Sequence, residues 1–247
     1  TKLLDNYSND LSQLVVLFPS LRARTFFNDA IEQASNRPTW QPHYTTIDDL
    51  MSRGSGLVRG ERIRLISELF KIYNEKFPRE EFDHFYYWGD MLISDFDMID
   101  KYMVNAKLLL VNLSDLKELE ADVSYLTKEQ KDIIKSFWSN FQNKQDIDDL
   151  SIQKQRFLEM WKALPVIYTN FRNNLLEKHI GYTGLIYRTA AERITNNEVV
   201  DIEPKRFIIA GFNALSKSEQ ILFKHLQSLD IEVICRLVEH KKVGGRH

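Results

Sequence analysis

The run Leu14-Val-Val-Leu-Phe18 decides the fold, because these five consecutive apolar residues are stopped at once by Pro19. A short, continuous apolar run is typical of a strand that is buried on both faces, as in a parallel sheet. Ser20 follows, and it can cap a helix that extends to about Gln33. A buried strand that leads directly into a helix predicts an α/β fold.

A second strand is expected over His43–Ile47, where Pro38 and Pro42 precede it. Asp48 stands where it can cap the short helix that follows this strand. Strand and helix therefore alternate in this part of the chain, as they do in parallel sheets.

The remaining strands are expected near the other end of the chain. Arg206–Ala210 and Ile231–Cys235 are apolar runs of strand length. Between them Ser216 can cap a helix to about Leu226, and Glu219 stands at the capping-box position. Strand, helix and strand in this order form a right-handed crossover unit.

The middle of the chain is predicted to be helical, and only 9 glycines and 6 prolines interrupt the sequence. Apolar residues recur at three- and four-residue spacing in five segments, which are Gly60–Lys76, Phe82–Met103, Ala106–Glu120, Thr127–Gln142 and Ser151–Lys178. Thr127 and Gln130 form a capping box, and Pro165 is expected to kink or divide its long helix. Tyr182–Arg193 is predicted to be one more helix.

These patterns predict a small parallel sheet, built from both ends of the chain, with a large all-helical insertion. Residues 1–53 and 201–237 are expected to form the sheet domain and residues 54–200 the insertion. Residues 238–247 are expected to be a disordered tail, because they are basic, contain glycine and show no periodicity.

The composition limits the classes of function. The net charge of -2 gives no strong positive field, so any contact with nucleic acid is expected to be local. Cys235 is the single cysteine, which excludes an intrachain disulfide and a cysteine zinc site. No apolar run approaches the roughly 20 residues that a membrane-spanning helix needs, and Thr1–Asp10 resembles no targeting peptide. We therefore expect a cytoplasmic protein without a membrane partner.

No phosphate-binding loop of the form G-x-x-x-x-G-K-[ST] is present. The glycines of the segment Gly54–Gly60 have neither this spacing nor that of a dinucleotide loop, so the segment is predicted to be an ordinary flexible loop. The histidines show no ligand spacing, and no nucleophile with its base is visible. The sequence therefore predicts no catalytic residue and no metal ligand in this chain.

Two groups of acidic residues have to be weighed as metal ligands, namely Asp90, Asp95, Asp97 and Asp100, and Asp115, Glu118, Glu120 and Asp122. Metal chemistry needs carboxylates that converge on one point. On a helix Asp95 points away from Asp90 and Asp97, so a solvated acidic face is the preferred interpretation of both groups.

A nuclease signature of the type D…(D/E)-x-K is matched only loosely. Asp230 with Glu239 and Lys241 has the spacing, and so does Asp201 with Glu203 and Lys205. Such loose matches arise by chance where 28% of the residues are charged. A self-contained metal nuclease that uses Glu239 and Lys241 stays open as an alternative.

Two arginines point to DNA. Arg22 and Arg24 fall in the first turns of a helix, just beyond the end of a buried strand. Cations are unfavourable at the start of a helix because of its dipole, so an anionic partner explains them better than helix stability. The alternative is that they only solvate the surface. Trp40 and Tyr44 are candidates for stacking on bases, although core packing or a lid over the sheet is the preferred interpretation.

Several segments resemble AddB-like proteins of the Bacteroides group, whose opening is of the form VVFPNRRARLFF. The similar segments are Leu14–Phe27, Pro38–Pro42, Thr45–Leu50, Phe85–Asp97, Asn112–Leu119 and Phe207–Ser216. The likeness covers most of residues 10 to 230, and the tail after Cys235 does not match.

The resemblance implies a long polypeptide that processes broken DNA ends. Its N-terminal region would be helicase-like, and a PD-(D/E)XK exonuclease domain that uses Mg²⁺ would follow beyond His247. This chain would need no cofactor of its own. The implied partners are an AddA-like helicase subunit and single-stranded or end DNA.

The resemblance also allows a comparison with the motor domains of superfamily 1 helicases, in which a strand ending in D-E-x-x-D holds Mg²⁺ and orients water. Aligning the glutamine that follows this motif on Gln220 puts Gly211 and Phe212 at the two acidic positions. Neither residue can hold a metal or orient water, so this Walker B position is degenerate and the ATPase is expected to be inactive. Arg22, Arg24 and Thr46 fall in segments that resemble helicase positions that contact the backbone of single-stranded DNA.

The function expected from these observations is a non-catalytic module of a double-strand-break repair helicase-nuclease. The module would handle or position single-stranded DNA for a downstream nuclease domain. The alternative is a protein-interaction scaffold that docks a helicase partner and makes no contact with DNA.

Overall fold

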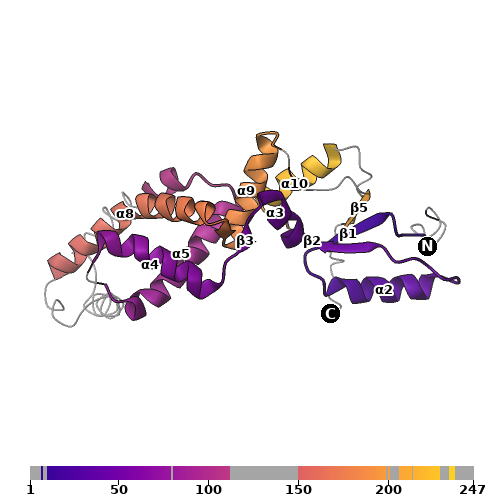
Figure 1. Ribbon diagram of the computed structural model, residues 1–247, viewed down its shortest axis with the longest axis horizontal. Coiled ribbons are helices and arrows are strands. Elements are labelled where there is room, and N and C mark those ends of the chain that lie inside the picture. The colour runs from indigo at the N-terminus through magenta and orange to yellow at the C-terminus, as the bar shows by residue number, and fades with distance from the viewer. Residues whose placement is uncertain are drawn as a thin grey trace, which may run out of the picture. The chain divides into compact units, whose positions relative to one another are not determined.

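The computed structural model describes residues 7, 10–78, 80–111, 150–198, 200, 206–212, 214–228 and 234–236 (Figure 1). The chain divides into two compact units. The sheet unit consists of Thr1–Gly56 and Ile186–His247, and the helical unit of Leu57–Leu185. The fold is α/β, with mostly helices and a small parallel sheet, as the sequence predicted.

The sheet unit contains four parallel strands in the order β2-β1-β5-β6. They are β1 (Leu14–Phe18), β2 (His43–Thr46), β5 (Arg206–Ala210) and β6 (Ile234–Arg236). All five residues of β1 are buried, because β1 is central and pairs with β2 on one side and with β5 on the other. The predicted strands are confirmed, and β6 falls at the end of its predicted range.

Helix α2 (Ala23–Ala34) connects β1 to β2 and covers one face of the sheet (Figure 1). Phe27 and Ile31 of this helix pack against a core cluster of Leu11, Leu14, Val16, Phe18 and Ile208. Residues of the opposite face, such as Val15, Leu17, Phe207 and Ile209, are also buried. Burial on both faces is what the unbroken apolar run of β1 predicted.

Three of the four predicted helix caps lie in the described part of the chain, and one of these three is confirmed. In α10 (Lys217–Ser228) the Ser216 hydroxyl accepts from Glu219 N at 3.4 Å, and Ser216 N donates to the Glu219 carboxylate at 2.6 Å. Ser20 does not cap α2, because the helix begins three residues later and Ser20 contributes only its carbonyl to the preceding turn. Asp48 does not cap α3 (Ile47–Ser55) either, because β2 ends one residue early and Thr46 takes the cap position.

Helix α9 (Thr183–Thr195) is grouped with the sheet unit from Ile186 onward, although the predicted insertion extends to residue 200. Its side chains bind α3 directly: Tyr187 OH donates to Asp48 Oδ1 at 2.6 Å, and Arg193 Nη1 donates to Gly54 O at 2.9 Å. A Cβ atom on Gly54 would lie 3.4 Å from Ala190 Cβ, so the two helices are in close contact. These contacts join residues that are far apart in the sequence, so no local sequence pattern predicts them.

The helical unit contains α4 (Arg62–Lys76), α5 (Phe82–Lys101) and α8 (Leu150–Glu177). Helix α4 packs against both α5 and α8. The largest side chains of the core are aromatic, with Phe85, Phe96 and Phe171 almost completely buried. Helix α8 continues through Pro165, so of the two effects predicted for this proline, a kink or a division, the division does not occur. Ala163, Leu164 and Ile167 are buried beside it, and their packing offsets the lost hydrogen bond.

The prediction of an all-helical insertion is wrong in one respect. Strands β3 (Val58–Arg59) and β4 (Ile180–Gly181) form a parallel pair, in which Val58 N donates to His179 O and Gly60 N to Gly181 O, both at 3.0 Å. Strands of two residues are too short to show a periodic pattern. The glycine-rich segment 54–60 is thus not a plain loop: it ends α3, turns at Gly56 with a φ of 71° and enters β3.

Several predictions concern residues outside the described part of the chain. They include the capping box at Thr127, most of the two helices over 106–142, the acidic group 115–122 and the tail over 238–247. The loose nuclease matches also lie outside it, namely Asp201, Glu203, Lys205, Asp230, Glu239 and Lys241. Within the described part, no helix is long and apolar enough to cross a membrane.

Candidate nucleic-acid interface

The carboxyl-terminal edge of the sheet brings together most of the residues that the sequence singled out. Phe18 at the end of β1 pairs with Thr46 at the end of β2. On the other side of β1, Gly211 follows β5, and a Cβ atom placed on it would lie 3.6 Å from Pro19 Cδ. In open α/β folds, ligands bind beyond the carboxyl ends of the strands, where neighbouring strands lead away to different helices. The turn Pro19–Arg22, Thr46 and Gly211 therefore share the edge at which a ligand site is expected.

Arg22 and Arg24 stand at the start of α2, directly after this edge. Arg22 is the N-cap residue, its side chain makes no capping hydrogen bond, and the first turn of the helix contains no acidic residue. Both arginines are exposed, and within the described part of the chain neither forms an ion pair. Two exposed, unneutralised guanidinium groups lie at a position where the helix dipole disfavours cations.

Tyr44 on β2 positions one of these arginines. The Arg24 guanidinium lies over the Tyr44 ring at 5.0 Å from its centroid, a cation–π contact. The ring stacks on Phe18 at a centroid distance of 6.1 Å, and its hydroxyl donates to Asn28 Oδ1. Burial raises the pKa of Tyr44, while the charge of Arg24 acts in the opposite direction. Tyr44 is therefore a packed residue that supports Arg24, in agreement with the core-packing interpretation, and its faces are not open to a base.

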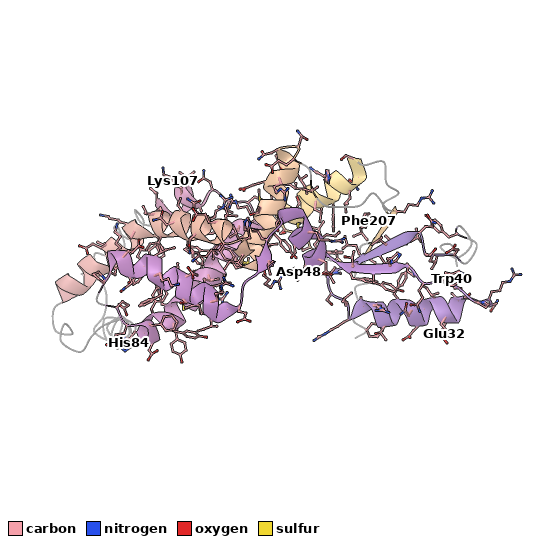
Figure 2. The ribbon with its side chains drawn as sticks, in the orientation of Figure 1. Glu32, Trp40, Asp48, His84, Lys107 and Phe207 are labelled. Carbon is pink, nitrogen blue, oxygen red and sulfur yellow. The ribbon has the colours of Figure 1, made fainter. Side chains whose placement is uncertain are left out.

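Trp40 belongs to the other end of the sheet. It forms an isolated bridge with Asp10 before β2 begins, and its carbonyl accepts from Leu11 N at 3.1 Å. Figure 2 shows Trp40 and Asp48 at opposite ends of β2. The Trp40 side chain is 74% exposed, so the interpretation as a core or lid residue is wrong. Trp40 stands in the segment that leads from the end of α2 to the start of β2.

Phe26 is an exposed aromatic residue at the interface that the sequence did not single out. It lies one turn after Arg22 on α2, and its side chain is 76% exposed. The next residue, Phe27, faces the core and packs edge-to-face on Phe18 at 5.8 Å. The two phenylalanines differ only in which side of α2 they occupy. The structure, in which α2 begins at Ala23, shows which of them faces the core. An exposed ring one helical turn from a cation, here Arg22, is a combination that can bind single-stranded nucleic acid.

Thr46 has a structural role in the capping box of α3. Its hydroxyl donates to Asp49 Oδ2 at 2.7 Å and accepts from Asp49 N at 3.1 Å. Asp48 and Asp49 place negative charge in the first turn of this helix. A phosphate that approached Thr46 would meet these carboxylates, so among the three residues that the sequence proposed for DNA contact only Arg22 and Arg24 present a basic surface at this edge.

Gly211 and Phe212, which the sequence comparison aligned with the two acidic positions of a helicase motor, contribute no ionisable group to the end of β5. Gly211 has a φ of 83°, in the left-handed region that favours glycine. Phe212 is 4% exposed and packs edge-to-face on Phe223 of α10 at 5.2 Å. Gln220 donates to Leu215 O at 3.1 Å and so supports the turn before α10. Among the described residues no group of His, Cys, Asp or Glu side chains is arranged to hold a metal ion.

Two of the four acidic residues of α5, Asp97 and Asp100, do not belong to the solvated face that the sequence predicted, whereas Asp95 is exposed. Asp100 is completely buried and accepts hydrogen bonds from Tyr168 OH and Tyr182 OH. Burial and the nearby Asp100 carboxylate together raise the pKa of Tyr182 well above its usual range. Asp97 accepts from Gly184 N at 2.6 Å and pairs with Lys101 at 3.2 Å, and Asp90 pairs with Arg62. The prediction failed for Asp100 and Asp97 because these partners are distant in the sequence. Tyr168 on α8 lies 68 residues from Asp100, Tyr182 between β4 and α9 lies 82 residues from it, and Gly184 of α9 lies 87 residues from Asp97.

No family model matches the chain, and no curated protein shows a significant match to it.

Proposed function

We propose that the sheet unit contacts single-stranded DNA through Arg22 and Arg24, as a non-catalytic, helicase-like module of a double-strand-break repair helicase-nuclease. The observation that carries the proposal is the pair of exposed arginines without acidic partners at the carboxyl edge of a parallel sheet. Two such groups can bind adjacent backbone phosphates, which position a strand without reading its sequence. Phe26, one turn further along α2, supplies a ring on which a base can stack.

An inactive ATPase site is part of this proposal. The strand end at Gly211 and Phe212 offers a backbone turn and a buried ring where a motor needs two carboxylates. Such a module would hold DNA and would not move along it by hydrolysing ATP. Movement would come from an AddA-like helicase subunit, and cleavage from a downstream Mg²⁺-dependent nuclease domain. Both follow from the resemblance to AddB-like proteins.

The proposal is tested by the fluorescence anisotropy of a labelled oligothymidylate over a range of salt concentrations. We expect an affinity that falls with salt and a weaker affinity in the double variant Arg22→Ala/Arg24→Ala. The salt slope, which is the slope of log affinity against log salt concentration, should become less steep by about 0.7 for each lost phosphate contact. The double variant should therefore have a slope that is less steep by about 1.4. Arg37→Ala is the matched control, because Arg37 is an exposed arginine of the same unit that lies beyond α2 near the opposite edge.

Two results would favour an alternative function, either the protein-interaction scaffold or the self-contained nuclease. If the wild-type chain does not bind the oligonucleotide at low salt but still retains a helicase partner, the scaffold that makes no contact with DNA is the better description. If Mg²⁺ induces cleavage that Glu239→Ala abolishes, the chain is itself a nuclease. Equal losses in the Arg22/Arg24 and Arg37 variants would indicate nonspecific electrostatics and would contradict the proposed interface.

A further inference from the structure

Helix α5 exposes an apolar stripe on the side of the helix that does not face its own core. Its buried side chains include Phe85, Trp88, Leu92, Phe96 and Ile99. On other positions of the helix and its cap, Tyr87 is 78% exposed, Met91 55%, Met98 53% and Tyr102 51%. A surface helix normally has polar side chains opposite its buried face. We call Tyr87, Met91, Asp95, Met98 and Tyr102 the α5 stripe.

The α5 stripe has the spacing of a helix-docking surface. Its members follow one another at intervals of four, four, three and four residues, so they lie along one line of the helix. From Tyr87 to Tyr102 the line is about 22 Å long at 1.5 Å per residue. Tyrosine and methionine are enriched at protein interfaces, because both present large apolar surfaces and methionine adapts its shape to its partner. The length and composition match one face of a helix of four to five turns.

Asp95 occupies the centre of the stripe and gives it a charge. Within the described part of the chain, its carboxylate makes no hydrogen bond or ion pair. The other carboxylates on this helix that lie nearby are engaged, because Asp90 pairs with Arg62 and Asp97 with Lys101. Asp83 adds an exposed acidic group near the beginning of the helix, next to His84, which Figure 2 marks. The stripe therefore has a single unneutralised carboxylate amid apolar side chains.

The negative charge of Asp95 limits which partner can cover the α5 stripe. Two copies that paired their stripes antiparallel around a two-fold axis would bring Asp95 against its own counterpart, because Asp95 is at the midpoint. Like charges in contact within an interface are costly. A helix with an apolar face and a central cation would instead form an ion pair with Asp95, and such central polar pairs fix the register of helix pairs.

We propose that the α5 stripe docks one amphipathic helix of a partner protein, whose apolar face covers the stripe and whose central Lys or Arg lies against Asp95. This inference concerns the helical unit alone and does not depend on DNA binding by the sheet unit. A cation elsewhere on the partner helix would leave Asp95 desolvated and unpaired, which gives the interface its specificity.

The first test is a displayed library of amphipathic helices of about 18 residues, with leucines fixed along one face and the central position randomised. Selection on the full chain should enrich Lys or Arg at that position by about tenfold, and selection on Asp95→Lys should enrich Asp or Glu instead. The proposal is overturned if no binder is selected or if both targets enrich the same residues.

The second test measures the affinity of a selected peptide for variants of the full chain. Met98→Asp should weaken binding at least about tenfold. Val166→Asp is the matched control, because Val166 lies on α8 of the same unit and is also 53% exposed; it should change binding by less than about twofold. Thermal unfolding of both variants shows that they are folded. Equal losses in both variants would overturn the proposal.

The third test shows whether the stripe is free in the unliganded chain. In a Cys235→Ser background, Met98→Cys introduces a thiol that should react with a maleimide as fast as the one introduced by Val166→Cys. Adding the selected peptide should slow only the first reaction. A thiol at position 98 that is already protected in a monomer would show that the chain itself covers the stripe. A dimer in sedimentation equilibrium that Met98→Asp dissociates would show that a second copy does. Either result overturns the proposal.

Discussion

The charged side chains of the two units differ in how they are used. In the helical unit Asp100, Asp97 and Glu68 are all bound by tyrosine hydroxyls, a backbone N–H or lysines of the same unit. At the carboxyl edge of the sheet unit, Arg22 and Arg24 are exposed and form no ion pair within the described part of the chain. Charges grouped along a helix can therefore be part of the internal structure, whereas cations at a strand end that have no acidic partner are candidates for binding an anionic ligand.

The largest effect is expected at Asp100, because its carboxylate is completely buried and binds two tyrosine hydroxyls. Asp100→Ala should lower the free energy of unfolding by about 3 kcal/mol, since both buried donors lose their acceptor. Asp100→Asn should cost less, because the amide oxygen can still accept one of these bonds. Urea denaturation measures both, with Asp95→Ala as the control. If Asp100→Ala is no more destabilising than the control, the internal role of this charge is refuted.

The next effect concerns the pH dependence of stability and arises from Glu68 on α4. Burial of its carboxyl disfavours ionisation, but hydrogen bonds from Lys178, Asn174 and Lys71 outweigh it and hold its pKa at about 2. Because this pKa is below the unfolded value of 4.5, the contribution to stability is present above pH 4.5. It is lost as the pH falls from 4.5 toward 2, with a total of about 3 kcal/mol.

Glu68→Gln provides the measurement for this prediction. The stability difference between wild type and Glu68→Gln should be greatest above pH 4.5 and should shrink as the pH approaches 2. Glu32→Gln on α2 of the sheet unit is the control, because Glu32 is an exposed glutamate. A difference between wild type and Glu68→Gln that does not vary with pH would contradict the proposed role of the lysine contacts.

A smaller effect is expected for the exposed ring of the sheet unit. Phe26→Ala should weaken binding of the oligothymidylate by about 1.4 kcal/mol, or about tenfold, because one stacked base is lost. Its salt slope should stay that of the wild type, since no phosphate contact changes. Phe26→Trp should preserve binding. A salt slope that falls together with the affinity would show that the variant disturbs the arginines and that Phe26 is not a stacking platform.

The smallest effect is a change in the stability of the sheet unit when Arg22 is replaced. Arg22→Glu should raise the free energy of unfolding by about 0.5 kcal/mol, because an acidic residue at a helix start interacts well with the dipole. The same substitution should weaken DNA binding by more than Arg22→Ala does. If Arg22 serves ligand binding, the native arginine should lower the stability of the protein while it supports DNA binding. Loss of stability in Arg22→Glu would instead show that Arg22 serves the fold.

Much of the sheet unit could be predicted from the sequence because its signals are local. The apolar run of β1 and the capping box of Ser216 and Glu219 are contained within a few neighbouring residues. The position of Arg22 and Arg24 after a strand end followed from the same order of elements. The exposure of Phe26 did not, because an error of a residue or two in the helix start exchanges the buried and exposed faces.

The helical unit shows why the rest could not be predicted. Asp100 and its tyrosines are separated by 68 and 82 residues, and Lys178 lies 110 residues from Glu68. Spacing within one helix tells which side chains share a face but not which face meets another helix. The acidic group of α5 therefore had the pattern of a solvated surface, while two of its members are internal acceptors.

The amino-acid sequence by itself determined the four strands of the sheet unit, their parallel order of connection, the helix cap before α10 and the lack of carboxylates at Gly211 and Phe212. These depend on backbone propensity, apolar runs and residue identity, all of which act over a few residues. Only the tertiary structure decided which charges are satisfied, which aromatic rings are exposed and that α5 has a second apolar face. Those properties depend on desolvation by neighbours that are distant in the sequence, and burial of that kind exists only after the chain has folded.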